Sequence, residues 1–272
     1  MRASSLLGVL GALLLSVALL VGGFAACCAP VTTSTLASLV SWGDYSPYTH
    51  EQLVPLAEAT RDVTVDYHRD AAAARKELAQ DVVDAARAAS GERSPKSLLW
   101  LTPAKDVLAS AGDDPVATMD ALAQVSDRYA LDADAVSHLE DCNRLISAAV
   151  PWLIGIVAAA VGLALILAAC GKLRALALML RLGPAVLVAA LLVLAVWGFV
   201  DFNGLFAVFH SLFFVDGTWT FNYDSLLISM YPIDFWMGMG GVWVVTSLAL
   251  SVLCFILGFV AARRARKRDE TA

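Results

Sequence analysis

Two of the four histidines in this sequence, His138 and His210, have surroundings in which an imidazole could transfer protons. His138 lies in the segment S-H-L-E-D, residues 137–141, just before a long apolar run, and His210 lies in an aromatic-rich stretch, residues 206–236. Histidine has an ordinary pKa of about 6.5, and an aromatic wall shifts that pKa by lowering the local dielectric. We therefore expect His210 to be a candidate base, and we expect the two histidines together to be functional rather than structural.

The histidines and cysteines do not form a metal-binding pattern. The sequence has no HExxH, no CxxC and no ladder of Cys and His residues, and it also has no glycine-rich phosphate loop. We expect no bound metal and no cofactor. His50 and His68 lie in polar surroundings typical of exposed, structural histidines. A metal-dependent membrane hydrolase would need three or more ligands, so we disfavour that class of enzyme.

The composition indicates an integral membrane protein. Hydrophobic residues make up 59% of the 272 residues, and the mean hydropathy is +0.70, so the apolar share exceeds that of ordinary soluble domains. The formal net charge is −6, and the basic residues cluster in a few places that the membrane topology below makes cytoplasmic. This charge pattern gives no indication of a nucleic-acid partner.

Four apolar runs are long enough to form transmembrane helices, each of which needs about 20 residues. The predicted fold is therefore a mainly α membrane protein, and its spans are residues 6–26, 145–170, 182–200 and 237–262. A cleaved signal peptide is the alternative for the first run, although its length and the three later spans favour an uncleaved anchor. The residues before Cys27 resemble a lipobox only faintly, because Phe24 is a poor residue three positions before the cysteine.

Basic residues beside the spans predict the orientation of the chain. Three of them lie in the short connection 171–181, and a basic tail, 263–272, follows the fourth span. The positive-inside rule then places both termini and that connection in the cytoplasm. We expect an extracytoplasmic domain at 31–144, an aromatic interfacial segment at 201–236, and both candidate histidines at the outer face of a multi-pass protein of the cell membrane. No charged residue lies deep in a span, which argues against a transporter.

The outer domain is predicted to be compact and helical. An amphipathic, alanine-rich pattern runs from Asp62 to Ala89, and a second helical stretch runs from Pro115 to Tyr129, with glycine and proline breaks between the two.

Two segments of the chain resemble the signature segments of a known family. Residues 136–141 contain S-H-L-E-D, and residues 209–236 read F-H-x-L-F-F, then W-x-F, D-x-L and P-x-x-F-W. Both are similar to the signatures of the lipoprotein intramolecular transacylase (Lit) family, bacterial membrane proteins with four spans. The resemblance covers the first span and the chain from about Leu131 onward. Residues 31–129 match poorly, the helix at 67–89 looks like an insertion, and Cys142 replaces an aliphatic residue.

The resemblance implies an acyltransferase whose substrate is a diacylglyceryl lipoprotein in the membrane. One acyl chain would move from the glyceryl group to the α-amino group of the N-terminal cysteine, giving the lyso-form lipoprotein. Donor and acceptor belong to one molecule, so proximity supplies the second reactant and no cofactor is needed. An α-amine has a pKa of about 7.7–8.0, so a histidine can accept its proton near neutral pH. By motif position, His138 and His210 would be the catalytic pair.

Seven more residues are candidates for binding or orienting the substrate: Glu140, Asp141, Phe213, Phe214, Trp219, Tyr223 and Asp224. Glu140 or Asp141 could orient His138 through its other ring nitrogen, or both could be solvated or paired with Arg144. Phe213, Phe214 and Trp219 fit a pocket wall and an interfacial anchor. Tyr223 and Asp224 are weaker polar candidates.

Two questions stay open at the level of sequence. A disulfide between Cys142 and either Cys27 or Cys28 is conceivable in an oxidising exterior. The alternative to an enzyme is a membrane protein without catalytic activity whose outer domain binds a partner or an envelope component.

Overall fold

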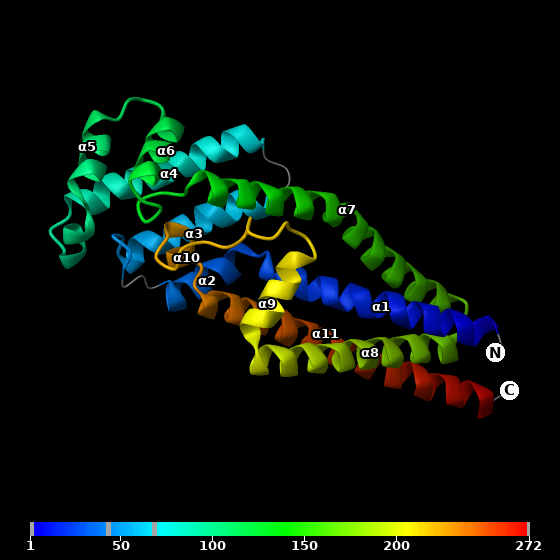
Figure 1. The fold of residues 1–272 in the computed structure, drawn as a ribbon. Helices are drawn as coiled ribbons and strands as arrows, with labels where there is room; N and C mark the ends of the chain where they lie inside the picture. Colours follow the sequence, from blue (N-terminus) through cyan, green and yellow to red (C-terminus); the bar gives the residue numbers. More distant parts are fainter. Residues whose placement is uncertain (1–2, 42–44, 67–69, 271–272) are drawn as a thin grey trace. The chain divides into compact units, whose positions relative to one another are not determined.

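The computed structural model describes residues 3–41, 45–66 and 70–270, and within these ranges every regular element is helical and no strand is present (Figure 1). His68 lies outside the described residues. The elements follow in the order α1 (Ala3–Cys27), α2 (Pro30–Val40), α3 (His50–Val65), α4 (Ala71–Gly91), the short 3-10 helix η1 (Pro95–Leu99), α5 (Thr102–Ser110), α6 (Pro115–Val125), α7 (Ala133–Ala169), α8 (Leu173–Val200), α9 (Phe202–Ser211), α10 (Leu226–Met230) and α11 (Ile233–Glu270).

Four of these helices, α1, α7, α8 and α11, are long and apolar enough to cross a membrane. The predicted fold class, a mainly α protein with four apolar spans, is confirmed. With 37 and 38 residues, α7 and α11 exceed the roughly 20 residues that a bilayer core requires. Each therefore continues well beyond one crossing, and the polar start of α7, residues 133–144, belongs to the part before the apolar run.

The connection between α7 and α8 is shorter than the predicted loop at 171–181, because α8 already begins at Leu173. Gly171 ends α7 in the left-handed region, with φ +67. The Lys172 amide donates to the Leu167 carbonyl at 2.9 Å, and the Gly171 amide donates to the Ala168 carbonyl at 3.1 Å. These bonds form a Schellman motif, which satisfies the last carbonyls of α7 and explains why a glycine is needed there.

The described chain divides into two compact units, and each is built from segments that are distant in sequence. Unit 1 comprises Met1–Cys27, Ala148–Phe206 and Gly240–Ala272. Its centre is the pairing of α1 with α8, where Gly183 lies so close that a Cβ added to it would be 2.9 Å from the Ala12 carbonyl oxygen. Trp243 on α11 donates its indole N–H to the Leu20 carbonyl at 2.8 Å. Small residues thus allow close helix packing, as is common between spans.

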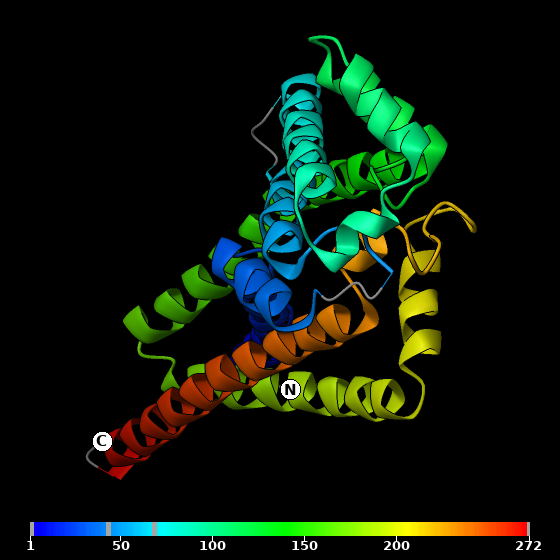
Figure 2. The same ribbon diagram turned by 90° about the vertical axis from the view of Figure 1, so that its left-hand side faces the viewer.

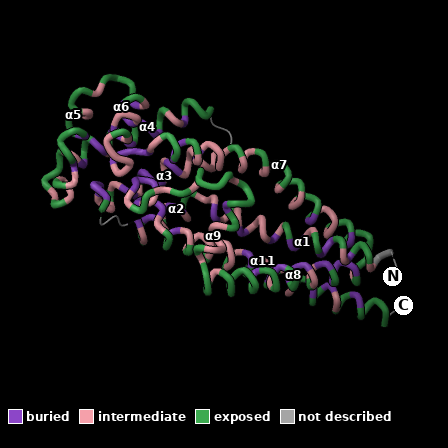
Figure 3. The backbone as a smooth tube through the Cα atoms, in the orientation of Figure 1, coloured by how far each residue is buried: buried purple, intermediate pink, exposed green. Residues whose placement is uncertain are grey.

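Unit 2 comprises Cys28–Ser147 and Ala207–Met239, and one hydrophobic core contains residues from both stretches. Within it α3 packs against α2, α4 and α10 (Figure 2). Tyr48, Trp100 and Tyr129 from the first stretch and Met230 and Phe235 from the second are all buried there. Figure 3 shows the buried positions along α3 and α4. The aromatic segment and the polar domain are therefore parts of one folded body.

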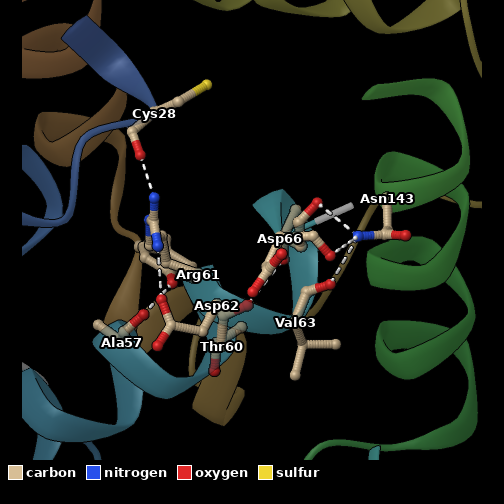
Figure 4. Close-up of polar contacts among 10 residues, drawn as sticks. Cys28, Ala57, Thr60, Arg61, Asp62, Val63, Asp66 and Asn143 are labelled. Carbon is tan, nitrogen blue, oxygen red and sulfur yellow. Dashed lines mark hydrogen bonds and ion pairs between the residues drawn. The ribbon is translucent and has the colours of Figure 1, made fainter. Parts of the chain in front are cut away.

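The Asn143 side chain attaches α7 to the end of α3. The Asn143 amide nitrogen donates to the carbonyls of Val63 at 3.0 Å, Thr64 at 3.3 Å and Asp66 at 3.1 Å (Figure 4). Helix C-termini leave such carbonyls without partners inside the helix. Figure 4 also shows Arg61 near the end of α3, where it bonds to the Cys28 carbonyl and forms an ion pair with Asp62.

Candidate functional site

The first turns of α7 place His138. The Asp132 carboxylate caps this helix by accepting from the Ala135 amide at 2.8 Å, which stabilises the helix start. Val136 and Leu139 are buried in the core of unit 2, and this fixes the rotation of α7 about its axis. His138 then shares a helix face with Cys142, four residues later.

The end of α9 places His210, which is 8% exposed. The chain turns back immediately after it, since the His210 carbonyl accepts from the Phe213 amide at 3.0 Å and from the Phe214 amide at 2.8 Å. Residues 212–225, which we call the return segment, connect α9 to α10 without regular helix. The return segment brings its aromatic side chains back toward the imidazole that precedes it.

The two histidines come together within unit 2, as the sequence predicts. Their ring centroids lie 6.1 Å apart with an interplanar angle of 31°. The Phe214 ring contacts both imidazoles, with its centroid 4.9 Å from that of His138 and 5.8 Å from that of His210. Two imidazoles that are far apart in sequence therefore contact one aromatic wall.

Other aromatic rings complete that wall. Trp219 lies 4.9 Å from His210 between centroids, and Phe221 lies 5.6 Å from His138. Trp219 and Phe214 were among the predicted residues, whereas Phe221 was not. The W-x-F spacing could have identified Phe221, because in an extended segment residues i and i+2 point to the same side.

The two ring nitrogens of His138 have different surroundings. Nε2 lies 3.6 Å from the Cys142 sulfur, and Nδ1 is buried with no hydrogen-bond partner among the described residues. Burial, with a smaller contribution from His210, lowers the pKa of His138 to about 4, and Asp141 opposes this shift. His138 is therefore neutral at physiological pH, and a neutral imidazole keeps the lone pair that a base requires.

The two acidic residues beside His138 have other partners. Asp141 forms an ion pair with Arg144 at 2.7 Å, and Glu140 lies 3.8 Å from Arg75 on α4. Neither carboxylate bonds to a ring nitrogen of His138 in the described structure. The contacts thus favour the alternative that these acids are paired with arginine, and no contact supports an orienting role.

Three predicted residues contact partners other than the two imidazoles. Phe213 is 49% exposed and packs against Phe209, and Tyr223 is 72% exposed and packs against Tyr45. Asp224 forms an ion pair with Arg128. Their roles in binding or orienting a substrate remain predictions.

The cysteines are present as thiols in this structure. All five cysteines lie in the described ranges, and none of them forms a disulfide. Burial and the nearby Asp141 raise the pKa of the Cys142 thiol to about 12. Among the residues that the structure describes, no group of three or more His, Cys, Asp or Glu side chains is arranged to hold a metal ion.

The fold and the site define a helical, multi-pass integral membrane protein with two histidines packed among aromatic rings. Residues 114–236 match the model of the family described as lipoprotein intramolecular transacylase Lit. The matched region contains both signature segments and both histidines, so the resemblance to the Lit family is confirmed. At the level of the family, it indicates an acyltransferase that acts on lipoproteins.

A solved structure supports the fold. The in meso structure of the membrane integral lipoprotein intramolecular transacylase Lit from Bacillus cereus is similar over 99% of this chain and 98% of that chain, with a TM-score of 0.54 and 15% identity. The similarity in fold therefore extends over residues 31–129, where we expected the family resemblance to be poor. No protein in the search of curated proteins matches the chain.

Proposed function

We propose that this protein converts a diacylglyceryl lipoprotein into the lyso-form by moving one acyl chain from the glyceryl oxygen to the α-amine of the N-terminal cysteine. The observation that carries the proposal is the pair of imidazoles, 6.1 Å apart between centroids, on the segments that match the Lit signatures. The reaction requires one proton acceptor near the amine and one proton donor near the leaving oxygen.

The chemistry balances without any group from outside the substrate and the protein. The amine nitrogen attacks the ester carbonyl, and a neutral imidazole accepts the proton that this nitrogen loses. The C–O bond to glycerol then breaks. The imidazolium that has formed returns the proton to the glyceryl oxygen, either directly or through the second imidazole. Because the nucleophile and the ester are on one molecule, the protein contributes mainly orientation and proton transfer.

The surroundings of the imidazoles suit a lipid substrate. Phe214, Trp219 and Phe221 contact the two imidazoles, and aromatic rings offer apolar area on which an acyl chain can lie. The low pKa of His138 keeps that imidazole unprotonated when the pH is neutral. In this proposal the aromatic wall holds the acyl chain beside an imidazole that is unprotonated at neutral pH and therefore has a free lone pair.

We also propose that the site faces the extracytoplasmic side. The two stretches of unit 2 share one hydrophobic core, and such a core cannot be divided between the two sides of a bilayer. Basic residues follow α7, in the 171–181 region, and end α11. The positive-inside rule assigns those positions to the cytoplasm, so unit 2 would face outward.

The test is made in bacterial cells that lack every other N-acylating activity and that express one tagged lipoprotein. The transfer is an isomerisation, so the intact N-terminal peptide keeps its mass, and tandem mass spectrometry must locate the acyl chains. We expect fragments with one acyl chain on nitrogen when the protein is present and none when it is absent. If the wild-type protein leaves both chains on glycerol, the proposal is wrong and a binding role becomes the better interpretation.

A further inference from the structure

We propose that Asp127 and Arg128 form a clamp that positions the return segment, and thereby sets the distance between His138 and His210. This inference rests on the proposed function for its catalytic consequence, and on geometry alone for the clamp itself. Asp127 and Arg128 lie in the short connection between α6 and α7, which leads directly into the helix that carries His138.

Three contacts join these two residues to the end of the return segment and the start of α10. The Asn222 amide donates to the Asp127 carboxylate at 2.7 Å. The Leu226 backbone N–H donates to the Asp127 carbonyl at 2.8 Å. The Arg128 guanidinium forms an ion pair with Asp224. These three contacts lie within five residues, 222–226. They therefore fix both the position and the direction of this part of the chain relative to Asp127 and Arg128.

The ion pair of the clamp is unlike an ordinary surface pair. The Asp224 side chain is 11% exposed, whereas that of Arg128 is 41% exposed. An exposed pair contributes little, because water screens it and both side chains lose freedom. A largely buried carboxylate that loses its partner costs more, since its charge is then neither hydrated nor paired. The ion pair therefore fixes the position of Asp224, which an exposed surface pair would not do.

The return segment needs an external support because it has no regular structure of its own between α9 and α10. It bends at Gly217, where φ is +88. It nevertheless carries Phe214, Trp219 and Phe221, three of the rings that contact the imidazoles. Phe221 directly precedes Asn222, so a shift of the clamped residue moves the ring beside His138.

Packing next to the clamp leaves little room for adjustment. A cavity of about 10 Å³ is lined by residues of both segments, among them Asp127, Asp132, Phe221 and Ser225. This volume is at the lower limit for a single water molecule. The two segments therefore pack closely next to the clamp, and Phe221 is one of the residues at this contact.

The first test compares turnover and substrate affinity in variants of the full-length protein. Arg128→Gln and Asp224→Asn remove one charge each with little change in shape. We expect turnover at saturating lipoprotein to fall by about tenfold to a hundredfold, as expected for a displacement of about 1 Å, with KM changed far less. Arg128→Lys keeps the charge and should recover part of the activity. The control is Arg87→Gln, which removes an exposed i,i+3 pair with Asp84 on α4 and should have no effect.

The second test does not depend on activity. In a chain whose own cysteines are replaced by alanine, His138→Cys and His210→Cys are joined by a short bifunctional thiol reagent in membranes. We expect fast cross-linking with Arg128 present, and at least a fivefold slower reaction after Arg128→Gln. Arg87→Gln should leave the rate unchanged.

The outcomes separate the clamp from the proposed function. Equal cross-linking rates with and without Arg128→Gln would overturn the clamp, whatever the activity. Loss of turnover that merely follows a loss of folded protein, measured as thermal stability in detergent, would also overturn it. A wild-type protein that transfers no acyl chain would refute the proposed function, yet a cross-linking rate that depends on Arg128 would still support the clamp.

Discussion

The Cys142 sulfur lies 3.6 Å from Nε2 of His138, one helical turn further along α7. The other ring nitrogen, Nδ1, has no hydrogen-bond partner among the described residues. The thiol is thus the polar contact that this imidazole makes in the described structure. Thiols are weak hydrogen-bond donors and acceptors. The thiol contact therefore has little effect on the basicity of the His138 ring.

Cys142→Val is expected to lower acyl transfer by less than about threefold, because the weak contact of the thiol contributes little and valine fills a similar volume. Cys142→Trp should abolish transfer by displacing His138. The measurement is formation of lyso-form lipoprotein by each variant at equal membrane abundance. An inactive but well-folded Cys142→Val protein would contradict this expectation, and would point to an acyl-thioester intermediate on Cys142.

Replacing either histidine should abolish the reaction. We expect His138→Gln and His210→Gln each to lower the rate by at least about a hundredfold, the usual contribution of a general acid or base, and the double variant to lose little more. Groups that act as a unit give such non-additive losses. His50→Gln is the control, since its Nδ1 lies 3.0 Å from the Ser41 carbonyl in another part of unit 2. Near wild-type rates in both single variants would rule out the catalytic pair.

The pH dependence of activity should reflect the pKa of the substrate amine rather than the pKa of His138. The folded protein keeps His138 neutral above a pH of about 4, so this imidazole is available as a base throughout the range from pH 5 to 8. The lipoprotein amine, with a pKa of about 7.7–8.0, still loses its proton over that range. Activity should rise with pH and level off above about pH 8. A profile that levels off near pH 6.5 instead would show that an ordinary histidine limits the rate.

The same shift in the pKa of His138 makes stability depend on acid pH. The pKa lies near 4 in the folded protein and at about 6.5 in the unfolded chain, so between these values the unfolded chain binds more protons. Stability must then fall as the pH falls through that window. His138→Gln has no such proton to bind, so the loss of thermal stability between pH 6.5 and 4.5 should be smaller in this variant than in the wild type, as measured by Tm in detergent.

Asn143 should be important for stability rather than chemistry. Its amide donates to three partly buried carbonyls at the end of α3. Leaving a fully buried polar group without a partner costs about 1–3 kcal/mol, and we expect a smaller cost for each of these carbonyls. Asn143→Asp keeps the shape but directs a carboxylate at the same carbonyls, so it should lower Tm more than Asn143→Ala does. Ser147→Ala is the control, because its hydroxyl only bonds to the Asn143 oxygen at 3.4 Å. Equal Tm values for all three variants would show that the hydrogen bonds from Asn143 to the end of α3 do not contribute to stability.

The predicted orientation in the membrane can be examined by cysteine labelling from outside intact cells. In a chain without its own cysteines, we expect Ser90→Cys to react with a membrane-impermeant reagent and Thr271→Cys to react only after the cells are opened. Labelling of Thr271→Cys in intact cells would refute the extracytoplasmic site.

The sequence alone predicted the four apolar helices, because the length of an apolar run is a local property. The approach of His138 to His210 was expected on other grounds, since both lie next to predicted spans at the outer face and in the two segments that resemble the Lit signatures. The continuity of α7 through residue 145 was not predicted, since both the polar turns before it and the apolar turns after it are compatible with helix. The proximity of Cys142 to His138 follows from their spacing of four once that helix is known. The clamp from Asp127 to Asn222 could not be predicted, because it depends on tertiary packing between distant segments.

The division of unit 2 into Cys28–Ser147 and Ala207–Met239 has a consequence for biosynthesis. When the ribosome has made His138, the residues that complete its surroundings are not yet synthesised, and two further spans must be inserted before His210 emerges. The core of the unit, which needs Met230 and Phe235, is incomplete during the same interval. The nascent protein therefore cannot complete the site until the chain has been made through Phe235, and no amino-terminal fragment that stops before α9 can bring the two histidines together.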